Sequence, residues 1–351
     1  MIFASDNWAG AHPAIAERLL KESAGFAAAY GTSDLDRKVE DRFNEIFERK
    51  VAVFFVGTGT AANSLALASV ARPGGVAFCH TEAHVTVDEC GAPELFTGAC
   101  RLVPVPGADG KIDPAALAAA IGRFPPGAVH QGRPIVVTIT QATESGSIYS
   151  LDEIDRIAAM ARAHHVPLHM DGARFANALV ALGTTPAEMT WKRGVDILSF
   201  GATKNGCWCA EALVFMNPEA ARDMPFIRKR AAQLFSKSRF IAAQFDAYLE
   251  QDRWLDLARH ANAMADGLRA GIAASNSGRL GWDTHSNEVF AVLKKEAAEA
   301  ATAKGTKFYD WPIPADMPGL VGPDEVLIRL VTSFATTESD VSDFIAAIKA
   351  A

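Results

Sequence analysis

The stretch VAVFFVGTGTAANSLALASV, at residues 51–70, decides the fold class. Its first six residues are apolar throughout, which predicts a strand over residues 51–56 that is buried on both faces. The segment GTGTAANS at residues 57–64 then leads into a helix-like stretch over residues 65–70. A buried strand followed directly by a helix is typical of a parallel sheet whose faces are covered by helices.

Short apolar runs and amphipathic segments alternate in the same way over most of the chain. A helix is expected over residues 150–164, because Ser150 and Glu153 form the capping box that starts a helix, and another over residues 173–182. Apolar runs predict further strands at residues 76–79, 101–105, 135–140, 166–170, 196–200 and 212–215. The sequence therefore predicts an α/β fold with a mostly parallel sheet.

The length of the chain, 351 residues, is enough for a large domain and a smaller one. A helical pattern at residues 218–271 is the natural junction between them. The strands expected at residues 286–293 and 325–330 and the helix expected at residues 338–350 would form a small α+β unit. We accordingly predict an N-terminal arm, a large domain and a small C-terminal domain at residues 1–12, 13–245 and 246–351.

Composition and charge exclude several classes of function. The formal net charge is −7 and no basic stripe with interleaved aromatic residues occurs, so we expect no nucleic-acid partner. The five cysteines are odd in number and lack the spacing of a zinc knuckle, so we expect reduced thiols and no metal site. The start of the sequence lacks the pattern of a signal peptide, and no apolar run reaches about 18 residues. We therefore expect a cytoplasmic protein with no membrane partner.

Four segments with unusual residues follow predicted strands, where a parallel sheet binds its ligands. The first is GTGTAANS at residues 57–64. The backbone N–H groups of Gly59, Thr60 and Ala61 would lie at the helix start, where the helix dipole favours an anion such as phosphate. The segment lacks the third glycine of a dinucleotide fingerprint and the lysine of a Walker loop. A plain glycine turn is the alternative.

The second segment is HMDGAR at residues 169–174. Asp171 ends a buried strand, where a carboxylate needs a partner. Its alternative role is to cap the helix that follows. Arg174 lies at the start of that helix, where the dipole disfavours a cation. This placement indicates an anionic ligand nearby.

The third and fourth segments carry a lysine and a histidine. Lys204 lies among small residues in SFGATKNG, residues 199–206, and a lysine withdrawn from water there is a nucleophile for carbonyl carbon. A side chain that reaches out to solvent is the alternative. His84 lies in TEAHVTVDECGAPE, residues 81–94, close to carboxylates that could orient it. A purely structural histidine is the alternative there.

Together the four segments match one ligand, pyridoxal phosphate. Its phosphate suits the helix start and its pyridine nitrogen suits the carboxylate of Asp171. Its aldehyde suits the amine of Lys204, and the face of its ring suits the imidazole of His84. Each segment alone has a plain structural explanation, and only the combination indicates the cofactor.

Longer motifs extend over nearly the whole chain: SDNWAGAHP, YGTSDLDRKVEDRFNEIF, GTGTAANSLAL, AHVTVDECGAPE, ITQATESGSIYSLDEI, LHMDGARFANALVALG, DILSFGATKNG, KSRFIAAQ and IRLVTSFATT. In these motifs the chain resembles the L-threonine aldolases of the fold-type-I, β-eliminating-lyase group of pyridoxal-phosphate enzymes. It is especially similar to their low-specificity and phenylserine-aldolase branch. The resemblance implies a PLP-dependent transferase-like large domain of fold type I, with a mostly parallel sheet, and a small α+β C-terminal domain.

The resemblance also implies roles around the cofactor. It makes Lys204 in SFGATKNG the residue that bonds the cofactor covalently, and Asp171 in HMDGAR the partner of the pyridine nitrogen. The phosphate would be held by Gly59 and Thr60. His84 would stack on the ring and lie near the substrate hydroxyl.

By the same resemblance, the substrate carboxylate would lie between Arg174 in HMDGAR, Arg329 in IRLVTS and Ser5 in SDN. Arg239 in KSRF would reach the cofactor phosphate of a neighbouring subunit, and Tyr30 in YGTSD would lie near a neighbour's active site. This sharing implies a homotetramer built from catalytic dimers.

One segment departs from the family pattern. Where many members have a histidine in E-N-T-H-N-G, this chain has QATESG, with Glu144 at the place of the histidine. The group that takes the proton of the substrate hydroxyl is therefore open. His84 is the first candidate, and Glu144 acting through a water is the second.

The activity that the resemblance implies is cleavage of L-threonine, L-allo-threonine and related β-hydroxy-α-amino acids such as phenylserine. The products would be glycine and an aldehyde, formed by breaking the Cα–Cβ bond, in glycine biosynthesis and amino-acid metabolism. The alternative is the reaction of another fold-type-I enzyme, an aminotransferase or a β-eliminating lyase, because the cofactor site is common to these reactions.

Overall fold

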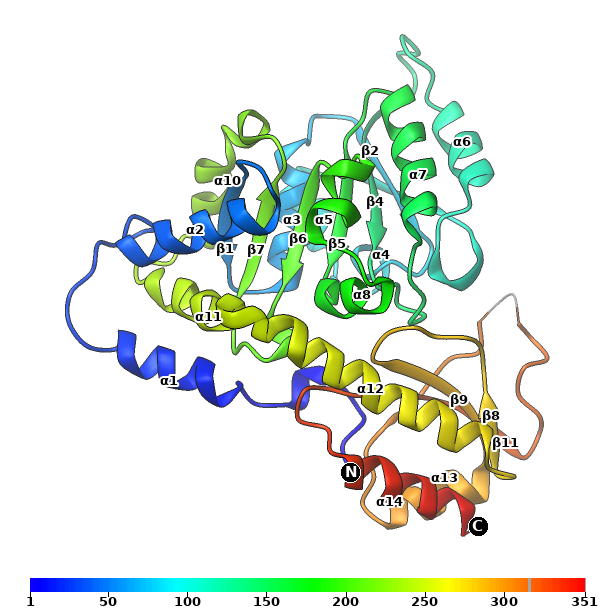
Figure 1. Cartoon of the computed structure of the whole chain (residues 1–351). Helices are drawn as coiled ribbons and strands as arrows, with labels where there is room; N and C mark the ends of the chain where they lie inside the picture. Colours follow the sequence, from blue (N-terminus) through cyan, green and yellow to red (C-terminus); the bar gives the residue numbers. More distant parts are fainter. Residues whose placement is uncertain (315–316, 351) are drawn as a thin grey trace.

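Seven strands form the central sheet, in the spatial order β1-β7-β6-β5-β4-β2-β3 (Figure 1). The computed structural model describes residues 1–314 and 317–350, so residue 351 of the predicted small domain lies outside it. The strands are Ala52–Val56 (β1), Gly75–His80 (β2), Arg101–Val105 (β3), Arg133–Thr140 (β4), Leu168–Gly172 (β5), Ile197–Gly201 (β6) and Glu211–Phe215 (β7). The predicted strands of this sheet are confirmed, each within about two residues of its observed bounds.

Strand β7 is the only reversed strand of this sheet. It is antiparallel to both of its neighbours, β1 and β6, whereas the other neighbouring pairs are parallel. The connection from β6 to β7, residues 202–210, holds only the 3₁₀ turn η4 (Thr203–Asn205). A parallel neighbour needs a crossover of a dozen or more residues, so this short connection returns the chain antiparallel. The prediction of a mostly parallel sheet is confirmed.

Successive residues of these strands face two separate cores. Val136 and Ile197 pack in a cluster with residues of one set of helices, whereas their neighbours Val137 and Leu198 pack in a cluster on the other face. This alternation explains why the strands are apolar throughout. The first face is covered by α3 (Gly59–Ser69) and α10 (Met224–Arg230), and the second by α2 (Asp34–Ile46), α7 (Leu151–Ala163) and α8 (Phe175–Leu182).

Helix α7 begins as predicted. Ser150 is its N-cap, and its Oγ accepts from the N–H of Glu153 at 3.2 Å while the Glu153 carboxylate accepts from the N–H of Ser150 at 2.7 Å. The helix expected at residues 65–70 starts earlier, at Gly59, because the glycine segment itself is helical. The remaining helices of the large part are α1 (Pro13–Glu22), α4 (His84–Val87), α5 (Ala92–Phe96), α6 (Pro114–Gly122), α9 (Pro186–Met189) and α11 (Arg239–Leu249).

A second, antiparallel sheet lies in the C-terminal part, in the order β10-β11-β9-β8. Its strands are Gly278–Leu280 (β8), Glu288–Lys294 (β9), Tyr309–Asp310 (β10) and Glu325–Val331 (β11), and it packs with α13 (Lys295–Ala303) and α14 (Glu338–Lys349). The N-terminal arm adds to this part, because the N–H of Phe3 donates to Lys307 at 2.7 Å and its carbonyl accepts from Val331 at 2.8 Å. The predicted α+β unit is confirmed.

Helix α12 (Arg253–Ala273) connects the two parts and runs across both in Figure 1. Its first turns, at Trp254 and Ala258, pack in the core of the large part, and Ala265 and Leu268 pack in the core of the small part. The two cores thus divide within one continuous helix. The domain bounds given above stay our proposal. Among the described helices, none has both the length and the apolarity needed to cross a bilayer.

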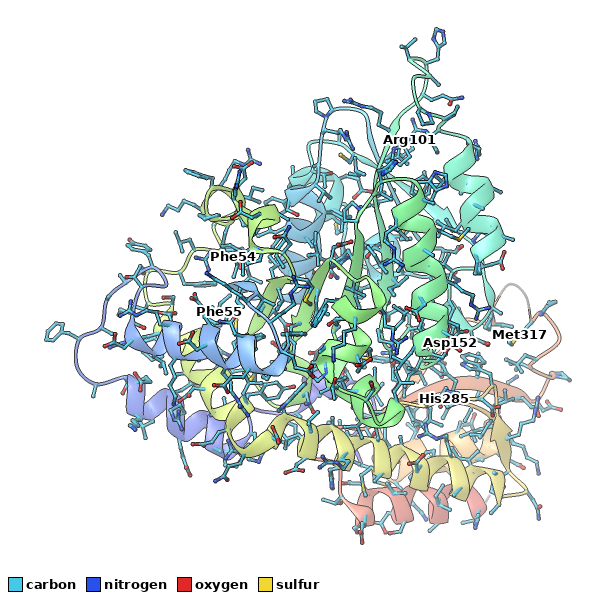
Figure 2. The ribbon with its side chains drawn as sticks, turned by 45° about the horizontal axis from the view of Figure 1, so that its top comes forward. Phe54, Phe55, Arg101, Asp152, His285 and Met317 are labelled. Carbon is cyan, nitrogen blue, oxygen red and sulfur yellow. The ribbon has the colours of Figure 1, made fainter. Side chains whose placement is uncertain are left out.

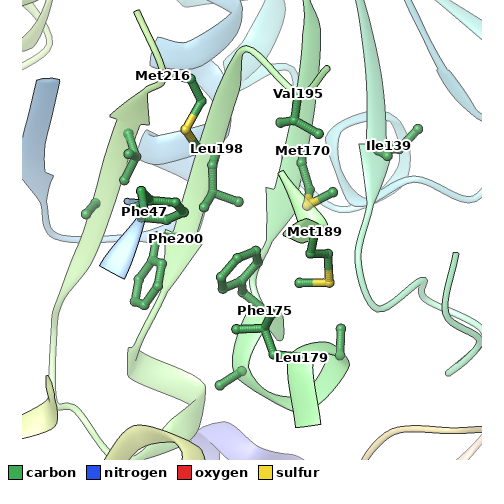
Figure 3. Close-up of a cluster of buried hydrophobic side chains, with 14 of the residues drawn as sticks. Phe47, Ile139, Met170, Phe175, Leu179, Met189, Val195, Leu198, Phe200 and Met216 are labelled. Atoms are coloured by element: carbon green, nitrogen blue, oxygen red, sulfur yellow. The ribbon is translucent and has the colours of Figure 1, made fainter. Parts of the chain in front are cut away.

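Phe200 of β6 lies in an aromatic group on the second face of the sheet, beside Phe175 of α8 (Figure 3). Its ring centroid is 5.2 Å from that of Phe43, 5.4 Å from that of Phe175 and 5.6 Å from that of Trp254. Aromatic pairs at such distances stabilise beyond the area that they bury. This packing fixes β6 just before it reaches Lys204.

Replacing Phe200 with alanine should therefore lower the free energy of unfolding by about 3–5 kcal/mol, because it leaves a cavity in a packed core. Urea unfolding followed by circular dichroism measures this change. The matched control is Phe226→Ala, since the side chain of Phe226 is 76% exposed. Equal unfolding midpoints for the two variants would contradict this account of the core.

Candidate active site

The segments predicted to carry chemistry meet at one edge of the central sheet. Strands β1, β2, β4, β5 and β6 run in the same direction, so their carboxyl ends lie at the same edge. One predicted residue lies at or after each end: Gly59 after β1, His84 after β2, Glu144 after β4, Asp171 as the next-to-last residue of β5 and Lys204 after β6. The topology therefore gathers residues that are far apart in the sequence.

Asp171 is buried, and both of its carboxylate oxygens accept hydrogen bonds. Oδ2 accepts from Nδ2 of Asn63 in α3 at 2.8 Å, and Oδ1 accepts from the N–H of Ala173 at 3.0 Å. The alternative role as a helix cap is wrong, because α8 begins at Phe175 with Arg174 in the cap position and no side-chain cap. The carboxylate of Asp171 is thus fixed by hydrogen bonds on β5. This strand pairs with β6, which leads to Lys204.

Asn63 joins Asp171 to a second buried carboxylate, that of Glu89. Nδ2 of Asn63 lies 2.9 Å from Oε1 of Glu89, and the same oxygen lies 3.0 Å from Nδ1 of His84. Because an ionised carboxylate only accepts, Nδ1 of His84 carries the proton in this contact. The other ring nitrogen, Nε2, is then the one that can exchange a proton with a ligand.

The hydrogen bond with Glu89 raises the pKa of His84 above its ordinary value, against the effect of partial burial. The charges of Glu144 and Asp171 raise this pKa further, and the charge of Lys204 lowers it. Burial raises the pKa of Glu89, and its hydrogen bonds with His84 and Asn63 lower it in part. His84 is therefore close enough to Asp171, Glu144 and Lys204 to interact with each of them.

Lys204 lies in the turn η4, which is anchored on both sides. Nδ2 of Asn205 donates to the hydroxyl of Tyr248 at 2.7 Å, and the carbonyl of Gly206 accepts from the N–H of His12 in the N-terminal arm at 2.8 Å. These contacts fix the backbone on either side of the lysine. Packing of the arm and of α11 thus decides where the amine lies.

Two buried acids lie within electrostatic range of Lys204. Asp6 and Glu211 both interact electrostatically with its amine. Burial raises the pKa of Glu211 to about 7, and the charge of Lys204 opposes that rise. Glu211 opens β7 and pairs in register with Gly201 at the end of β6. Lys204 is half-buried and these acids interact with its amine, which favours the nucleophile interpretation over a side chain that reaches out to solvent.

Arg174 is buried and shares its donors between two carboxylates. Its Nε and Nη2 donate to the two oxygens of Asp6 at 2.8 and 3.2 Å, and its Nη1 lies 3.2 Å from Oε2 of Glu288. Burial alone would raise the pKa of Asp6, but the charges of Arg174 and Lys204 and hydrogen bonds from Arg174 and Asn287 lower it. These acids hold the pKa of Arg174 above its ordinary value against burial.

Arg329 reaches the same place from the small domain. Its Nη1 lies 3.9 Å from Oε1 of Glu288, and its guanidinium lies 4.3 Å from the ring centroid of Trp311. The structure therefore brings Arg174 and Arg329 together, as the substrate prediction requires. It also places a carboxylate between them, which the sequence analysis did not foresee.

Ser5 and Glu144 lie next to the cluster formed by Arg174, Arg329 and their acidic partners. Oγ of Ser5 accepts from the N–H of Asn7 at 3.1 Å as the cap of η1 (Asp6–Trp8), and the next residue, Asp6, contacts Arg174. Glu144 lies in the connection from β4 to α7 and interacts electrostatically with Arg174. The small domain supports this connection through His285, which is labelled in Figure 2. The backbone N–H of His285 donates to the carbonyl of Gly146 at 3.0 Å.

The start of α3 offers two N–H donors instead of the three expected. The N–H of Ala61 donates to Oγ1 of its cap residue, Thr58, at 3.1 Å. Within the described part of the chain, the N–H groups of Gly59 and Thr60 have no hydrogen-bond partner. A Cβ added at Gly59 would meet no described atom within 4 Å. There is thus open space for a ligand beside these donors.

Tyr30 and Arg239 lie elsewhere, near the segment that connects α1 and α2. The N–H of Tyr30 donates to Ser236 at 3.1 Å, and the guanidinium of Arg239 donates to the carbonyl of Gly25 at 3.3 Å. Neither makes a hydrogen bond with His84 or with the acids around Lys204 among the described residues. The single chain does not bring them to the site.

Sequence reasoning missed four polar residues of the site: Asp6, Asn63, Glu211 and Glu288. Each is buried and contacts a predicted residue or lies within electrostatic range of one. For Glu288 and Glu211 a signal exists, because each is an acid at the start of an apolar strand. Glu89 belongs to the carboxylates near His84 that the sequence offered as its partners, and the structure selects it from among them.

The model of the family described as beta-eliminating lyase matches residues 3–296 of the chain. The chain belongs to the beta-eliminating lyase family. The family prediction made from the motifs is therefore confirmed. Members of this family depend on pyridoxal phosphate, which also confirms the predicted cofactor.

Relatives of this lyase match it over nearly its whole length. It is 40% identical to the low specificity L-threonine aldolase of Pseudomonas sp. (strain NCIMB 10558), over 99% of this chain and 97% of the relative. It is 42% identical to the enzyme of the same name from Pseudomonas aeruginosa, over 88% of each chain. The solved structure of Leishmania major threonine aldolase superposes with a TM-score of 0.91 at 28% identity, covering 99% of this chain and 98% of that one. This likeness confirms the predicted fold.

The residues of this lyase fit pyridoxal phosphate. The unpaired N–H groups at the start of α3 and the open space beside Gly59 suit a phosphate. Asp171 suits a protonated ring nitrogen, and Lys204, within range of His84, suits an aldehyde. The donors needed for each end of the cofactor are therefore present at one edge of the sheet.

Replacing Glu89 with glutamine should lower the pKa of His84 toward its ordinary value, because the charge that stabilises the protonated imidazole is lost. At neutral pH the variant should then hold less of the protonated form. Titration of the histidine ring signals by NMR measures this, with the His84 signal assigned by its loss in His84→Asn. Glu82→Gln, which changes an exposed carboxylate in the same segment, is the control and should leave the titration unchanged. An unshifted His84 signal in the Glu89 variant would contradict the contact.

Proposed function

We propose that the chain is a pyridoxal-phosphate-dependent aldolase that cleaves L-threonine, L-allo-threonine and related β-hydroxy-α-amino acids such as phenylserine to glycine and an aldehyde. The observation that carries the proposal is the likeness, over nearly the whole chain, to enzymes named low specificity L-threonine aldolase. The geometry at the sheet edge supports it, because a candidate base and a candidate carboxylate site lie near the cofactor residues.

Four residues would hold the cofactor. Lys204 would bind it through its amine, and Asp171 would hold a proton at the ring nitrogen. The N–H groups of Gly59 and Thr60 would donate to the phosphate. When bound, pyridoxal phosphate supplies an electron sink for the bond that breaks at the substrate α-carbon.

Arg174 and Arg329 would bind the substrate carboxylate and thereby orient the bond to be broken. Because Nε and Nη2 of Arg174 already donate to Asp6, a ligand would contact the Nη1 side of its guanidinium, which faces Glu288 in the unliganded chain. Ser5 would lie beside this site, since it precedes Asp6 in the arm. The clamp is thus assembled from the arm, the large domain and the small domain.

His84 would accept the proton of the β-hydroxyl at Nε2 as the aldehyde leaves. Its Nδ1 is held by Glu89, which fixes the ring and favours the protonated form that results. Glu144, acting through a water, is the second candidate for this proton. It lies within electrostatic range of both His84 and Arg174.

β-Elimination is the second candidate reaction, because the family model that matches the chain is described as beta-eliminating lyase. The two reactions share the cofactor residues and differ in the bond that breaks. Transamination differs in its products as well. The aldolase reaction requires a base at the β-hydroxyl, and His84 is placed to provide one.

We also propose a cytoplasmic homotetramer built from catalytic dimers, with a role in glycine formation. Tyr30 and Arg239 support the shared site, since both lie at the segment between α1 and α2 and away from Lys204. Phe26 in this segment is fully exposed in the single chain. If a neighbouring subunit packs on this segment, Tyr30 and Arg239 of this chain would lie near the cofactor bound by that neighbour.

The proposal is tested by supplying L-threonine, L-allo-threonine and L-phenylserine to the purified, cofactor-loaded protein. We expect glycine and acetaldehyde in equal amounts from the first two substrates, and glycine and benzaldehyde from the third. Coupled assays for the aldehydes and amino-acid analysis for glycine measure these products. A 2-oxo acid with ammonia from threonine would indicate elimination instead, and no aldehyde would refute the aldolase.

Replacing Lys204 with alanine should abolish the visible absorbance of the covalently bound cofactor and lower turnover by orders of magnitude, since no other amine takes its place. Absorption spectra and the aldehyde assay measure both effects. Lys304→Ala, at an exposed lysine of the small domain, is the control and should match the wild type. A wild-type spectrum with full activity in the Lys204 variant would rule this lysine out as the anchor.

A further inference from the structure

Glu288 occupies the place between the two arginines of the proposed carboxylate site. It opens β9 and its side chain has no solvent exposure. Oε2 lies 3.2 Å from Nη1 of Arg174, and Oε1 lies 3.9 Å from Nη1 of Arg329. Neither oxygen makes a hydrogen bond with the described residues. The carboxylate of Glu288 is therefore held mainly by its charge interaction with Arg174 and Arg329. A ligand carboxylate would use the same two guanidinium groups.

Three acids and three bases meet around this place. Asp6 takes the Nε and Nη2 donors of Arg174 and also interacts with Lys204, and Glu144 interacts electrostatically with Glu288. With Asp6, Glu144 and Glu288 ionised, their negative charges are balanced by Arg174, Arg329 and Lys204. A ligand carboxylate would add a negative charge to this buried place and leave it with an excess of one. Burial makes such an excess unfavourable.

A further charged group close by, Arg269, binds the backbone of Glu288 and not its carboxylate. Nη1 of Arg269 in α12 donates to the carbonyl of Glu288 at 3.3 Å, and its Nη2 is paired with Asp266. Arg269 fixes the start of β9 and leaves the balance of charge at the carboxylate unchanged. The side chain of Glu288 therefore depends on Arg174 and Arg329 for its compensation.

Burial raises the pKa of Glu288 to about 7; the charges of Glu144 and Asp6 raise it as well, and those of Arg174 and Arg329 lower it. Near neutral pH the group is thus divided between its two forms before any ligand binds. A group in this condition changes its protonation when a charge is added beside it.

We propose that Glu288 is an internal carboxylate that occupies Arg174 and Arg329 in the unliganded protein and takes up one proton when a substrate carboxylate docks on them. The inference rests on the proposed function, because it takes these two arginines as the substrate site. The proton comes from the solvent and forms an O–H bond on Glu288, and no other bond changes. Binding is then linked to pH through a residue that is not among those that would hold the cofactor.

The sign of the pH dependence follows from linkage. Below about pH 7 Glu288 already holds its proton, so a ligand carboxylate binds without further uptake. Above that pH the ligand has to be accompanied by a proton, so its affinity falls as pH rises, by up to about tenfold per pH unit. A glutamine at this position is neutral at every pH and removes this part of the dependence.

The test is calorimetric titration of the cofactor-loaded protein with glycine, which carries the substrate carboxylate, at about pH 8 in buffers of different ionisation enthalpy. We expect the wild type to take up close to one proton more per glycine than Glu288→Gln, and the variant to bind more tightly at this pH. Any proton exchanged at the amine is common to both proteins and cancels in the difference. Glu299→Gln, an exposed glutamate of α13 in the same domain, is the control and should match the wild type.

Equal proton uptake in the wild type and Glu288→Gln, or parallel slopes of affinity against pH, would overturn the proposal. Weaker glycine binding by the variant at every pH would also overturn it, since that result would mean that the negative charge is needed. If the variant does not fold, the wild type is titrated with acetate, which carries a carboxylate and no amine, and affinity independent of pH from about 7 to 9 is then the contradicting result. Failure of the aldolase assignment is recognised separately, by the absence of aldehyde from threonine with the wild type.

Discussion

The guanidinium of Arg174 is the point at which the three parts of the chain meet. It belongs to the large domain, and its two buried partners are Asp6 from the N-terminal arm and Glu288 from the small domain. A buried charge is unfavourable unless its partners compensate it, and removing one partner leaves the other uncompensated. Asn287 adds a link between the small domain and the arm by donating to Asp6 at 3.1 Å. The geometry at the edge of the sheet therefore depends on all three parts being in place.

Much of the fold could be predicted from local patterns, because those patterns have local causes. The apolar run before Gly57 became β1, and Ser150 with Glu153 started α7, since strand burial and helix capping each need only a few consecutive residues. The reversed direction of β7 could not be predicted from its composition, because a strand buried on both faces has the same apolar pattern in either direction. The early start of α3 at Gly59 was hidden by small residues with little periodicity.

The residues of the candidate site also divide into those with a local signal in the sequence and those without one. Asp171, His84 and Lys204 could be predicted as a group because each lies at or after the end of a strand, and a parallel sheet brings such ends together. Asn63 was not found, because its contact with Asp171 joins segments that are 108 positions apart in the sequence. Arg174 was predicted as a clamp for a ligand, and the structure adds that most of its donors already serve the protein itself. Such sharing of donors is a property of the packed molecule, and no sequence pattern encodes it.

Helix α12 restricts how the two domains can move. Its amino end is part of one core and its carboxyl end is part of the other, with unbroken helix between them (Figure 1). A hinge needs a few residues that can change their backbone angles freely, and a continuous helix at the crossing has none without breaking its hydrogen bonds. Helix α12 therefore holds the small domain rigidly against the large one. Access for an incoming molecule then depends on sliding of packed faces and on side-chain rearrangement, and swinging the domains apart is not available.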